Sequence, residues 1–103
     1  MKLSVIIPVF NSSKILEDLI ERIIKTSEKL NMKNNFEVIM INDNSSDNSW
    51  DVLKKLSKNY NFLTCINLTK NFGQHNAIMA GLNNAVGDCM ITLDDDLQHP
   101  PLS

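Results

Sequence analysis

Four short apolar runs divide the chain, and longer segments of mixed polar and apolar residues lie between them. The runs span residues 3–9, 36–41, 62–68 and 89–93 and are rich in Ile, Val and Leu. Apolar residues occupy mostly consecutive positions in these runs rather than alternate ones. This pattern predicts strands that are covered on both faces, as in a parallel sheet.

The three intervening segments show helical periodicity. The first carries one apolar stripe opposed by charged residues, and the stripe consists of Leu16, Leu19, Ile20, Ile23, Ile24 and Leu30. The second repeats apolar residues at helical intervals, at Trp50, Leu53, Leu56 and Tyr60. Asp47 precedes this segment, and we expect its side chain to cap the helix start. The third, 74–86, places Ala77, Gly81 and Ala85 four residues apart, which predicts close packing on the sheet.

The alternation of strands and helices predicts an α/β fold, one half of a doubly wound, Rossmann-like domain. It has about four parallel strands alternating with three helices, with a right-handed crossover at each step. Ligands of open parallel sheets bind outside the C-terminal ends of the strands. Four segments are expected to meet there, 8–11, 42–45, 69–73 and 94–96. The sequence therefore predicts one site at this edge.

An acidic triplet, Asp94-Asp95-Asp96, directly follows the fourth run. Adjacent carboxylates repel one another, so a cation between them would offset the repulsion. In an extended segment Asp94 and Asp96 share one side, with Gln98 two residues further on. Carboxylate and amide oxygens are ligands of Mg²⁺-like ions. From these residues alone, an acidic helix start or a solvated turn remains an equal alternative.

Four further residues are candidates for binding a nucleotide. The carboxylate of Asp43 can accept a hydrogen bond from the ring N–H of uracil or guanine, although a simple Asx-turn explains it equally well. Phe10 can lie against a base or sugar, with Pro8 fixing the strand exit, or it can be part of the core or its rim. Lys70 offers a charge for a diphosphate, or is ordinary solvated surface. The sequence marks no residue as a general base.

Composition excludes several classes of protein. The 103 residues suit a single domain, with 12 acidic and 10 basic side chains and a formal net charge of −2. This balance gives no electrostatic reason to expect nucleic acid or an anionic membrane as the main partner. No apolar stretch approaches the roughly 20 residues of a membrane span, so we expect a soluble chain.

Cys65 and Cys89 lie in apolar runs without metal-ligand spacing, which predicts two reduced core thiols and a cytoplasmic location.

These motifs, in this order, resemble the nucleotide-binding half of family-2 glycosyltransferases with the GT-A fold. The opening strand at 4–11 and the turn at 41–47 carry part of the resemblance. Segments 71–82 and 94–101 are more specific and resemble the polyprenyl-phosphate branch of the family. That branch includes dolichol-phosphate mannose synthase and the bacterial undecaprenyl-phosphate sugar transferases.

The resemblance implies roles for individual residues. The nucleoside contacts would be Pro8, Phe10 and Asp43, and Lys70 would lie near the donor. The metal and diphosphate would be held by Asp94, Asp96 and Gln98. The chain departs from the family pattern in two places: it has Asn42 where Asp is frequent, and Asp95 where a small residue is frequent. Asn42 removes one charge beside the expected base site, and Asp95 is expected to alter metal affinity.

The resemblance also implies a reaction. Members of this branch transfer a sugar from a UDP- or GDP-sugar to a polyprenyl phosphate, with inversion at the anomeric carbon and a divalent metal, Mg²⁺ or Mn²⁺. Residues 1–103 would be the donor-binding part, and the acceptor-binding part would follow Ser103. We therefore expect an N-terminal fragment with little or no activity alone. The full-length protein would act at the cytoplasmic face of the membrane.

Two other classes of function remain open from the sequence. One is a nucleotide-binding or self-associating module, whose exposed sheet edge pairs with a second copy to form a homodimer. The other is a phosphoryl-transfer enzyme or receiver domain, both of which are α/β proteins with acidic metal sites. Their acidic residues generally follow the first strand, whereas here segment 8–11 reads Pro-Val-Phe-Asn. Because of this difference, a phosphoryl-transfer enzyme or receiver domain ranks well below a glycosyltransferase or a nucleotide-binding module.

Overall fold

Strands and helices alternate along the chain as the apolar pattern predicts. The computed structural model describes residues 2–31, 35–68 and 74–93. The elements are β1 (Leu3–Val9), α1 (Leu16–Lys29), β2 (Phe36–Asp43), α2 (Ser49–Asn59), β3 (Leu63–Leu68), α3 (Gln74–Asn84) and β4 (Cys89–Thr92). The expected α/β fold, with four parallel strands and three helices, is confirmed.

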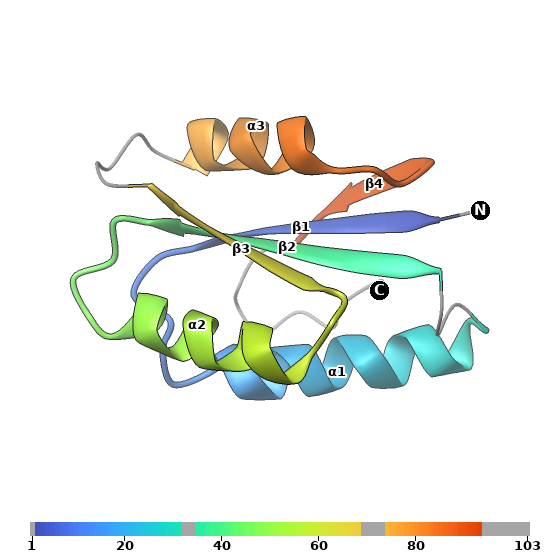
Figure 1. The fold of residues 1–103 in the computed structure, drawn as a ribbon, viewed down its shortest axis with the longest axis horizontal. Coiled ribbons are helices and arrows are strands. Elements are labelled where there is room, and N and C mark those ends of the chain that lie inside the picture. Colours follow the sequence, from blue (N-terminus) through green and yellow to red (C-terminus); the bar gives the residue numbers. More distant parts are fainter. Residues whose placement is uncertain (1, 32–34, 69–73, 94–103) are drawn as a thin grey trace.

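The four strands form one sheet with the order β3-β2-β1-β4, and every neighbouring pair is parallel. Helices α1 and α2 cover one face of the sheet and α3 covers the other (Figure 1). β1 is therefore an inner strand with a helix layer on each side. This position agrees with its composition, because all seven residues of β1 are buried.

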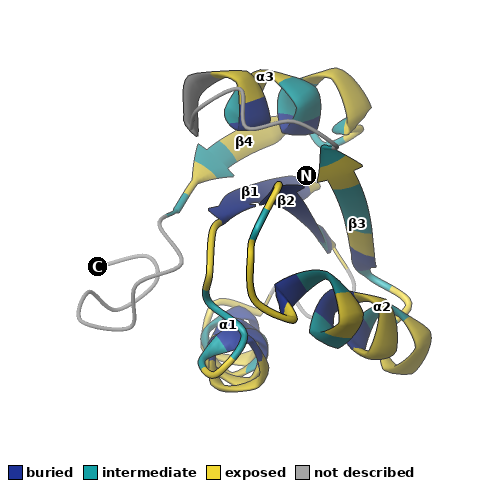
Figure 2. Cartoon of the chain, turned by 90° about the vertical axis from the view of Figure 1, so that its left-hand side faces the viewer, coloured by how far each residue is buried: buried dark blue, intermediate teal, exposed yellow. Residues whose placement is uncertain are grey.

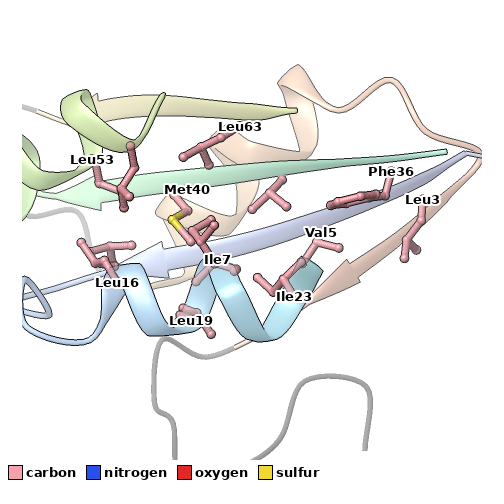
Figure 3. Close-up of a cluster of buried hydrophobic side chains, with 14 residues drawn as sticks. Leu3, Val5, Ile7, Leu16, Leu19, Ile23, Phe36, Met40, Leu53 and Leu63 are labelled. Carbon is pink, nitrogen blue, oxygen red and sulfur yellow. The ribbon is translucent and has the colours of Figure 1, made fainter. Parts of the chain in front are cut away.

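Two apolar layers hold the helices to the sheet. The larger lies beneath α1 and α2 and includes Val5, Ile7, Leu19, Met40 and Leu53 (Figure 3). The smaller lies beneath α3 and consists of Ile6, Ile39, Ile41 and Ala77. Successive residues of β1 and β2 alternate between these layers because side chains of a strand point to opposite faces. The runs at 3–9 and 36–41 are continuous in sequence because both faces are covered.

The fourth apolar run is less buried than the sequence predicts. Three of the four residues of β4 are exposed, and Met90 is 47% exposed. Within the described part of the chain, β4 is an edge strand with β1 as its neighbour. The expectation of two core thiols is wrong for Cys89, which is exposed, whereas Cys65 is half-buried. Neither cysteine forms a disulfide bond within the described residues.

Helix α3 approaches the sheet through its small residues. Ala77 is fully buried, and Gly81 lies over the aliphatic side chains of β1 and β2. A Cβ atom at Gly81 would lie 2.5 Å from Cγ2 of Ile6 and 2.8 Å from Cδ1 of Ile41. The predicted close packing of this helix face is confirmed. Glycine is required there because the neighbouring methyl groups occupy the space of a side chain.

A polar cluster ties the turn between α3 and β4 to the N-terminal edge of the sheet. The Glu37 carboxylate accepts hydrogen bonds from the Ser4 hydroxyl and, at 2.7 Å, from the Val86 N–H. The Ser4 oxygen in turn accepts from the Gly87 N–H at 2.8 Å. Ser4 is fully buried, so this cluster satisfies a polar group inside the fold. It holds β4 beside β1 at one end.

None of the helices in the described ranges combines the length and the hydropathy needed to cross a bilayer.

Substitution of Gly81 tests the close approach of α3. We expect Gly81→Ala to lower the free energy of unfolding by about 1–3 kcal/mol, because the added methyl group overpacks a filled core. Urea unfolding followed by circular dichroism measures the change. Asn83→Ala, at an exposed position of the same helix, is the control and should not destabilise the protein. Equal stability of Gly81→Ala and wild type would contradict the packing.

The two thiols should differ in reactivity. Burial raises the pKa of Cys65 to about 11, so only about a thousandth of this thiol is ionised at pH 8. The thiolate is the reacting form, and Cys89 is exposed. Labelling with a chromogenic disulfide at pH 8 should therefore show one fast and one slow thiol. Cys89→Ser should remove the fast phase and Cys65→Ser the slow one; the reverse assignment would refute the burial of Cys65.

Candidate functional site at the C-terminal edge of the sheet

The chain leaves β1 and β2 side by side at the C-terminal edge of the sheet. The last partners in their register are Val9 and Asn42. Beyond them, residues 10–15 form the β1–α1 connection and residues 44–48 form the β2–α2 connection. Figure 2 shows both connections descending together from the sheet towards α1 and α2. The predicted meeting of the first two polar segments at this edge is confirmed.

Both connections have an asparagine in the left-handed region of backbone conformation at or next to their first residue. Asn11 has a φ of 51° and Asn44 a φ of 53°. This region is unfavourable for most side chains but is tolerated by asparagine, whose short polar side chain can bond locally. The two residues let the chain turn sharply within two positions of the strand end.

The side chain of Asn11 binds the other connection. Its Oδ1 atom accepts hydrogen bonds from the Ser46 N–H at 2.8 Å and the Asp47 N–H at 3.3 Å. The Ser46 hydroxyl donates to the same atom at 3.2 Å. The Asn11 N–H donates to the Ser45 hydroxyl oxygen at 3.0 Å. Residues 34 to 36 positions apart in sequence are thus joined through the backbone N–H and the side-chain amide of one residue, Asn11.

Asp47 makes the reciprocal link. One oxygen accepts from the Ser13 N–H at 3.3 Å, and the other accepts from the N–H and the hydroxyl of Ser49. Ser49 is the first residue of α2, so the carboxylate satisfies an N–H of the first helical turn as expected. The helix boundary itself falls one residue later than expected, at Asn48, which makes no capping bond through its side chain.

These hydrogen bonds stabilise the ionised form of Asp47. Desolvation acts to raise the pKa of Asp47, but the hydrogen bonds from Ser49 and Ser13 lower it by more. The pKa of this carboxyl therefore lies below its ordinary value. At neutral pH the two connections are joined around a negative charge.

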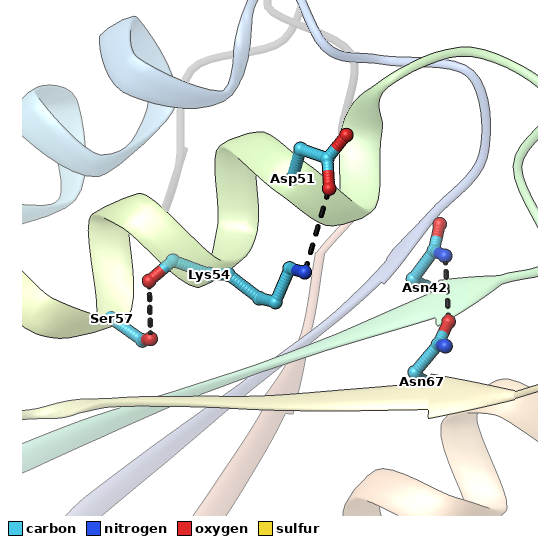
Figure 4. Close-up of polar contacts among 5 residues, drawn as sticks. All are labelled: Asn42, Asp51, Lys54, Ser57 and Asn67. Atoms are coloured by element: carbon cyan, nitrogen blue, oxygen red, sulfur yellow. Dashed lines mark hydrogen bonds and ion pairs between the residues drawn. The ribbon is translucent and has the colours of Figure 1, made fainter.

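The pleat of β2 sends its last two side chains to opposite faces. Asn42 shares the face of Met40, and its Nδ2 donates to the Asn67 Oδ1 at 2.8 Å (Figure 4). Asn42 is only 3% exposed, and its own Oδ1 is a buried acceptor without a partner among the described residues. Asp43 shares the face of Ile41, beneath α3, and is 5% exposed. Only a small part of the Asp43 carboxylate is accessible to a ligand.

Pro8 and Phe10 differ in how they meet solvent. Pro8 is buried inside β1, where it pairs in register with Ile41, and so lies within the strand rather than at its exit. Phe10 follows the strand and is 49% exposed. Of the expected nucleoside contacts, the structure presents the ring of Phe10 most openly. The roles of Pro8, Phe10 and Asp43 stay predictions.

The remaining expected site residues, Lys70, Asp94, Asp96 and Gln98, lie outside the described residues. The described chain ends at Leu93, whose N–H donates to the Ile6 carbonyl oxygen at 3.0 Å. The residue before the acidic triplet is therefore attached to β1. Elsewhere in the described ranges, no group of three or more His, Cys, Asp or Glu side chains is arranged to hold a metal ion. The metal site stays a prediction.

Sequence reasoning missed the residues that join the two connections. The sequence places Asn11 at the exit of the first strand, Ser45 and Ser46 in a segment rich in turn formers, and Ser49 at the end of a polar connection. Their abundance in the segment from 42 to 49 is a signal for turns. It does not reveal that Asn11 is their partner, because that pairing depends on the adjacency of β1 and β2.

The fold is that of known glycosyltransferase structures. A mannosyltransferase from Pyrobaculum calidifontis, solved in complex with GDP-Man and Mn²⁺, has a TM-score of 0.80 to this chain at 22% identity. The match covers 92% of this chain and 27% of that chain, and at this identity it establishes the fold alone. The sheet, its helix layers and this likeness define an α/β protein of the GT-A class. The chain belongs to glycosyl transferase family 2, whose model matches residues 4–103.

Two relatives are closer in sequence. The chain is 48% identical over 101 residues to the undecaprenyl-phosphate 4-deoxy-4-formamido-L-arabinose transferase of Proteus mirabilis (strain HI4320). This match covers 97% of the chain and 30% of that transferase. The structure of S. aureus TarS 1-349 in complex with UDP is 28% identical, with a TM-score of 0.74 over 93% of this chain and 28% of that chain. The chain thus spans under a third of the length of either relative.

The low pKa of Asp47 predicts a pH dependence of stability. A carboxyl whose pKa is lowered by folding stabilises the protein above its unfolded pKa and loses this contribution as the pH falls through the folded pKa. We expect Asp47→Asn to lower the midpoint of urea unfolding at pH 7. The difference from wild type should shrink as the pH falls below about 4.

Asp51→Asn is the matched control for this measurement. It removes the same charge four residues further along, where Asp51 forms an exposed ion pair with Lys54 at 3.5 Å (Figure 4). Exposed pairs of this kind contribute little to stability. A loss of stability in Asp47→Asn that does not change between pH 7 and pH 3 would contradict a role for the ionised carboxylate.

Proposed function

We propose that the chain is the donor-binding part of a glycosyltransferase that moves a sugar from a nucleotide-diphosphate sugar to a polyprenyl phosphate. The observation that carries this proposal is the position of half-exposed Phe10 and of Asp43, each of which directly follows one of the last β1–β2 register partners, Val9 and Asn42. This edge is where open α/β sheets bind ligands. The 48% identity to an undecaprenyl-phosphate sugar transferase supports the acceptor class.

The nucleoside would bind between these two side chains. The Asp43 carboxylate accepts a hydrogen bond from the ring N–H that both uracil and guanine offer. Phe10 lies against the base or the ribose, and Pro8 is the third expected nucleoside contact. A hydrogen bond to a charged group contributes more than a neutral one, so Asp43 favours these two bases over adenine. Solved relatives have been crystallised with UDP and with GDP-Man.

The diphosphate and a divalent ion would lie beside the nucleoside. Two carboxylates, Asp94 and Asp96, and the amide of Gln98 are hard oxygen donors of the kind that Mg²⁺ and Mn²⁺ prefer. Lys70 adds a positive charge near the donor. When bound, the ion neutralises charge on the departing nucleoside diphosphate. The hydrogen bond between Leu93 and Ile6 supports this arrangement, because it attaches the residue that precedes the acidic segment in sequence to the strand that precedes Phe10.

The acceptor supplies the nucleophile. A lipid phosphate is already an anion near neutral pH, so its attack on the sugar needs less help from a general base than attack by a hydroxyl group does. Direct attack inverts the anomeric carbon. A polyprenyl acceptor lies in a membrane, which would bring the whole enzyme to the cytoplasmic face of the bilayer. The donor-binding part holds the nucleoside diphosphate, which is the leaving group of this step.

Calorimetric titration of the 103-residue chain with UDP and GDP, in the presence and absence of Mn²⁺, tests the proposal. We expect one of the two nucleotides to bind when Mn²⁺ is present. Asp43→Asn should weaken that binding about 10-fold, because a charged acceptor becomes a neutral one. Asp18→Asn, at an exposed position of α1 that removes the same charge, is the control. The proposal fails if neither nucleotide binds at millimolar concentration with metal present.

A further inference from the structure

The paired backbone of β1 and β2 ends just before the two residues expected to contact the nucleoside. Val9 and Asn42 are the last partners in this register. Phe10 and Asp43 come next, so the β1–β2 pairing does not itself set the distance between their side chains. That distance depends on how the β1–α1 and β2–α2 connections are held together.

Each connection supplies one side chain that binds backbone N–H groups of the other. Asn11, in the β1–α1 connection, accepts from the N–H groups of Ser46 and Asp47. Asp47, in the β2–α2 connection, accepts from the N–H of Ser13 at 3.3 Å. The two side chains thus form reciprocal links across the gap between the connections. Hydrogen bonds to the Asp47 carboxylate are charge-assisted and stronger than neutral ones.

A second path joins Asp47 to the β1–α1 connection through Ser49. The Ser49 hydroxyl donates to Asp47, and its oxygen accepts from the Ser12 N–H at 2.9 Å. Ser49 is fully buried, so this path has little freedom to rearrange. Asp47 also lies just before α2, and its partner Ser13 lies just before α1. A carboxylate at this position interacts favourably with the N-terminal ends of both helices.

We propose that Asp47 is a positioning residue for donor binding, which fixes the separation of Phe10 and Asp43 without contacting the ligand. The inference rests on the proposed function, since it requires a nucleoside at this edge. Phe10 directly precedes Asn11, and Asp43 lies two residues before Ser45, whose hydroxyl binds the Asn11 N–H. Both ligand-contacting residues therefore lie within two positions of a link.

Loss of the links should affect affinity more than folding. The core beneath α1 and α2 is made by apolar side chains and does not depend on the connections. Connections that are free to separate must be ordered when the ligand binds, and this ordering weakens binding. The effect should be confined to the nucleoside, because Phe10 and Asp43 bind that part of the donor. Asp47 therefore differs from a residue whose loss would affect only the stability of the whole fold.

Calorimetric titration of the chain and its variants tests the inference. Each protein is titrated with the nucleotide that binds wild type, UDP or GDP, and separately with inorganic pyrophosphate, always with Mn²⁺ present. Asp47→Asn should weaken nucleotide binding about 5- to 20-fold, an estimate for the loss of one or two charged hydrogen bonds. Binding of pyrophosphate should not change. Asn11→Gly should have a similar effect, because glycine adopts the φ of 51° but lacks the accepting oxygen.

Two controls separate positioning from general stability. Asp51→Asn removes a charge from α2, outside both connections, and should leave both affinities unchanged. Phe36→Leu removes core packing at the opposite end of the sheet; it should lower the unfolding midpoint without changing nucleotide affinity. The double variant of Asp47 and Asn11 should lose less affinity than the sum of the single losses, since both act through one set of links.

The outcomes distinguish this inference from the proposed function. If the wild-type chain binds neither UDP nor GDP, the proposed function and the inference both fail. If wild type binds a nucleotide and Asp47→Asn binds it equally well, only the inference is overturned. Equal weakening of nucleotide and pyrophosphate binding would also overturn it, because a general loss of structure explains that result. Restoration of nucleotide affinity in Asp47→Glu relative to Asp47→Asn would support the role of the carboxylate.

Discussion

Burial of β1 on both faces is the constraint on which the rest of the structure depends. All seven of its residues are buried, with Val5 and Ile7 facing α1 and α2, and Ile6 facing α3. A strand of this kind must have a neighbour on each edge and a helix layer on each face. β2, β4 and the three helices meet these requirements (Figure 1). The candidate site lies at the C-terminal end of this strand and its neighbour, directly beyond their last register partners, Val9 and Asn42.

Two sets of hydrogen bonds hold the candidate site together. Hydrogen bonds of the sheet hold the strands up to Val9 and Asn42, and side-chain hydrogen bonds from Asn11 and Asp47 continue the connection beyond that point. The pleat then separates Asn42, which is buried on the face of α1 and α2, from Asp43 on the face of α3. A binding site on this edge therefore uses a few polar side chains on a rigid apolar support, as ligand sites in α/β proteins commonly do.

Polar side chains gather at both ends of the paired strands β1 and β2. The opposite edge has its own polar cluster, in which Glu37 and Ser4 bind the turn before β4. For Glu37, desolvation acts to raise the pKa, but the hydrogen bonds from Ser4, Val86 and Gly87 and the charge of Lys2 lower it by more. Both clusters attach a connection to the ends of β1 and β2. The cluster at the C-terminal edge lies beside Phe10, which is half-exposed.

The sequence by itself determined the order of strands and helices. A continuous apolar run or an apolar helical stripe is visible within a few neighbouring residues, because each reflects which side chains of that segment are buried. It also predicted the close approach of α3 at Gly81, because only small residues recur on that face. The tertiary structure decided the exposure of Cys89 and Met90, since an apolar run does not reveal whether its strand is inside a sheet or at its edge. It also decided that Asn11 binds Ser46 and Asp47. Those partners lie about 35 residues apart, and strand order, a long-range property, brings them together.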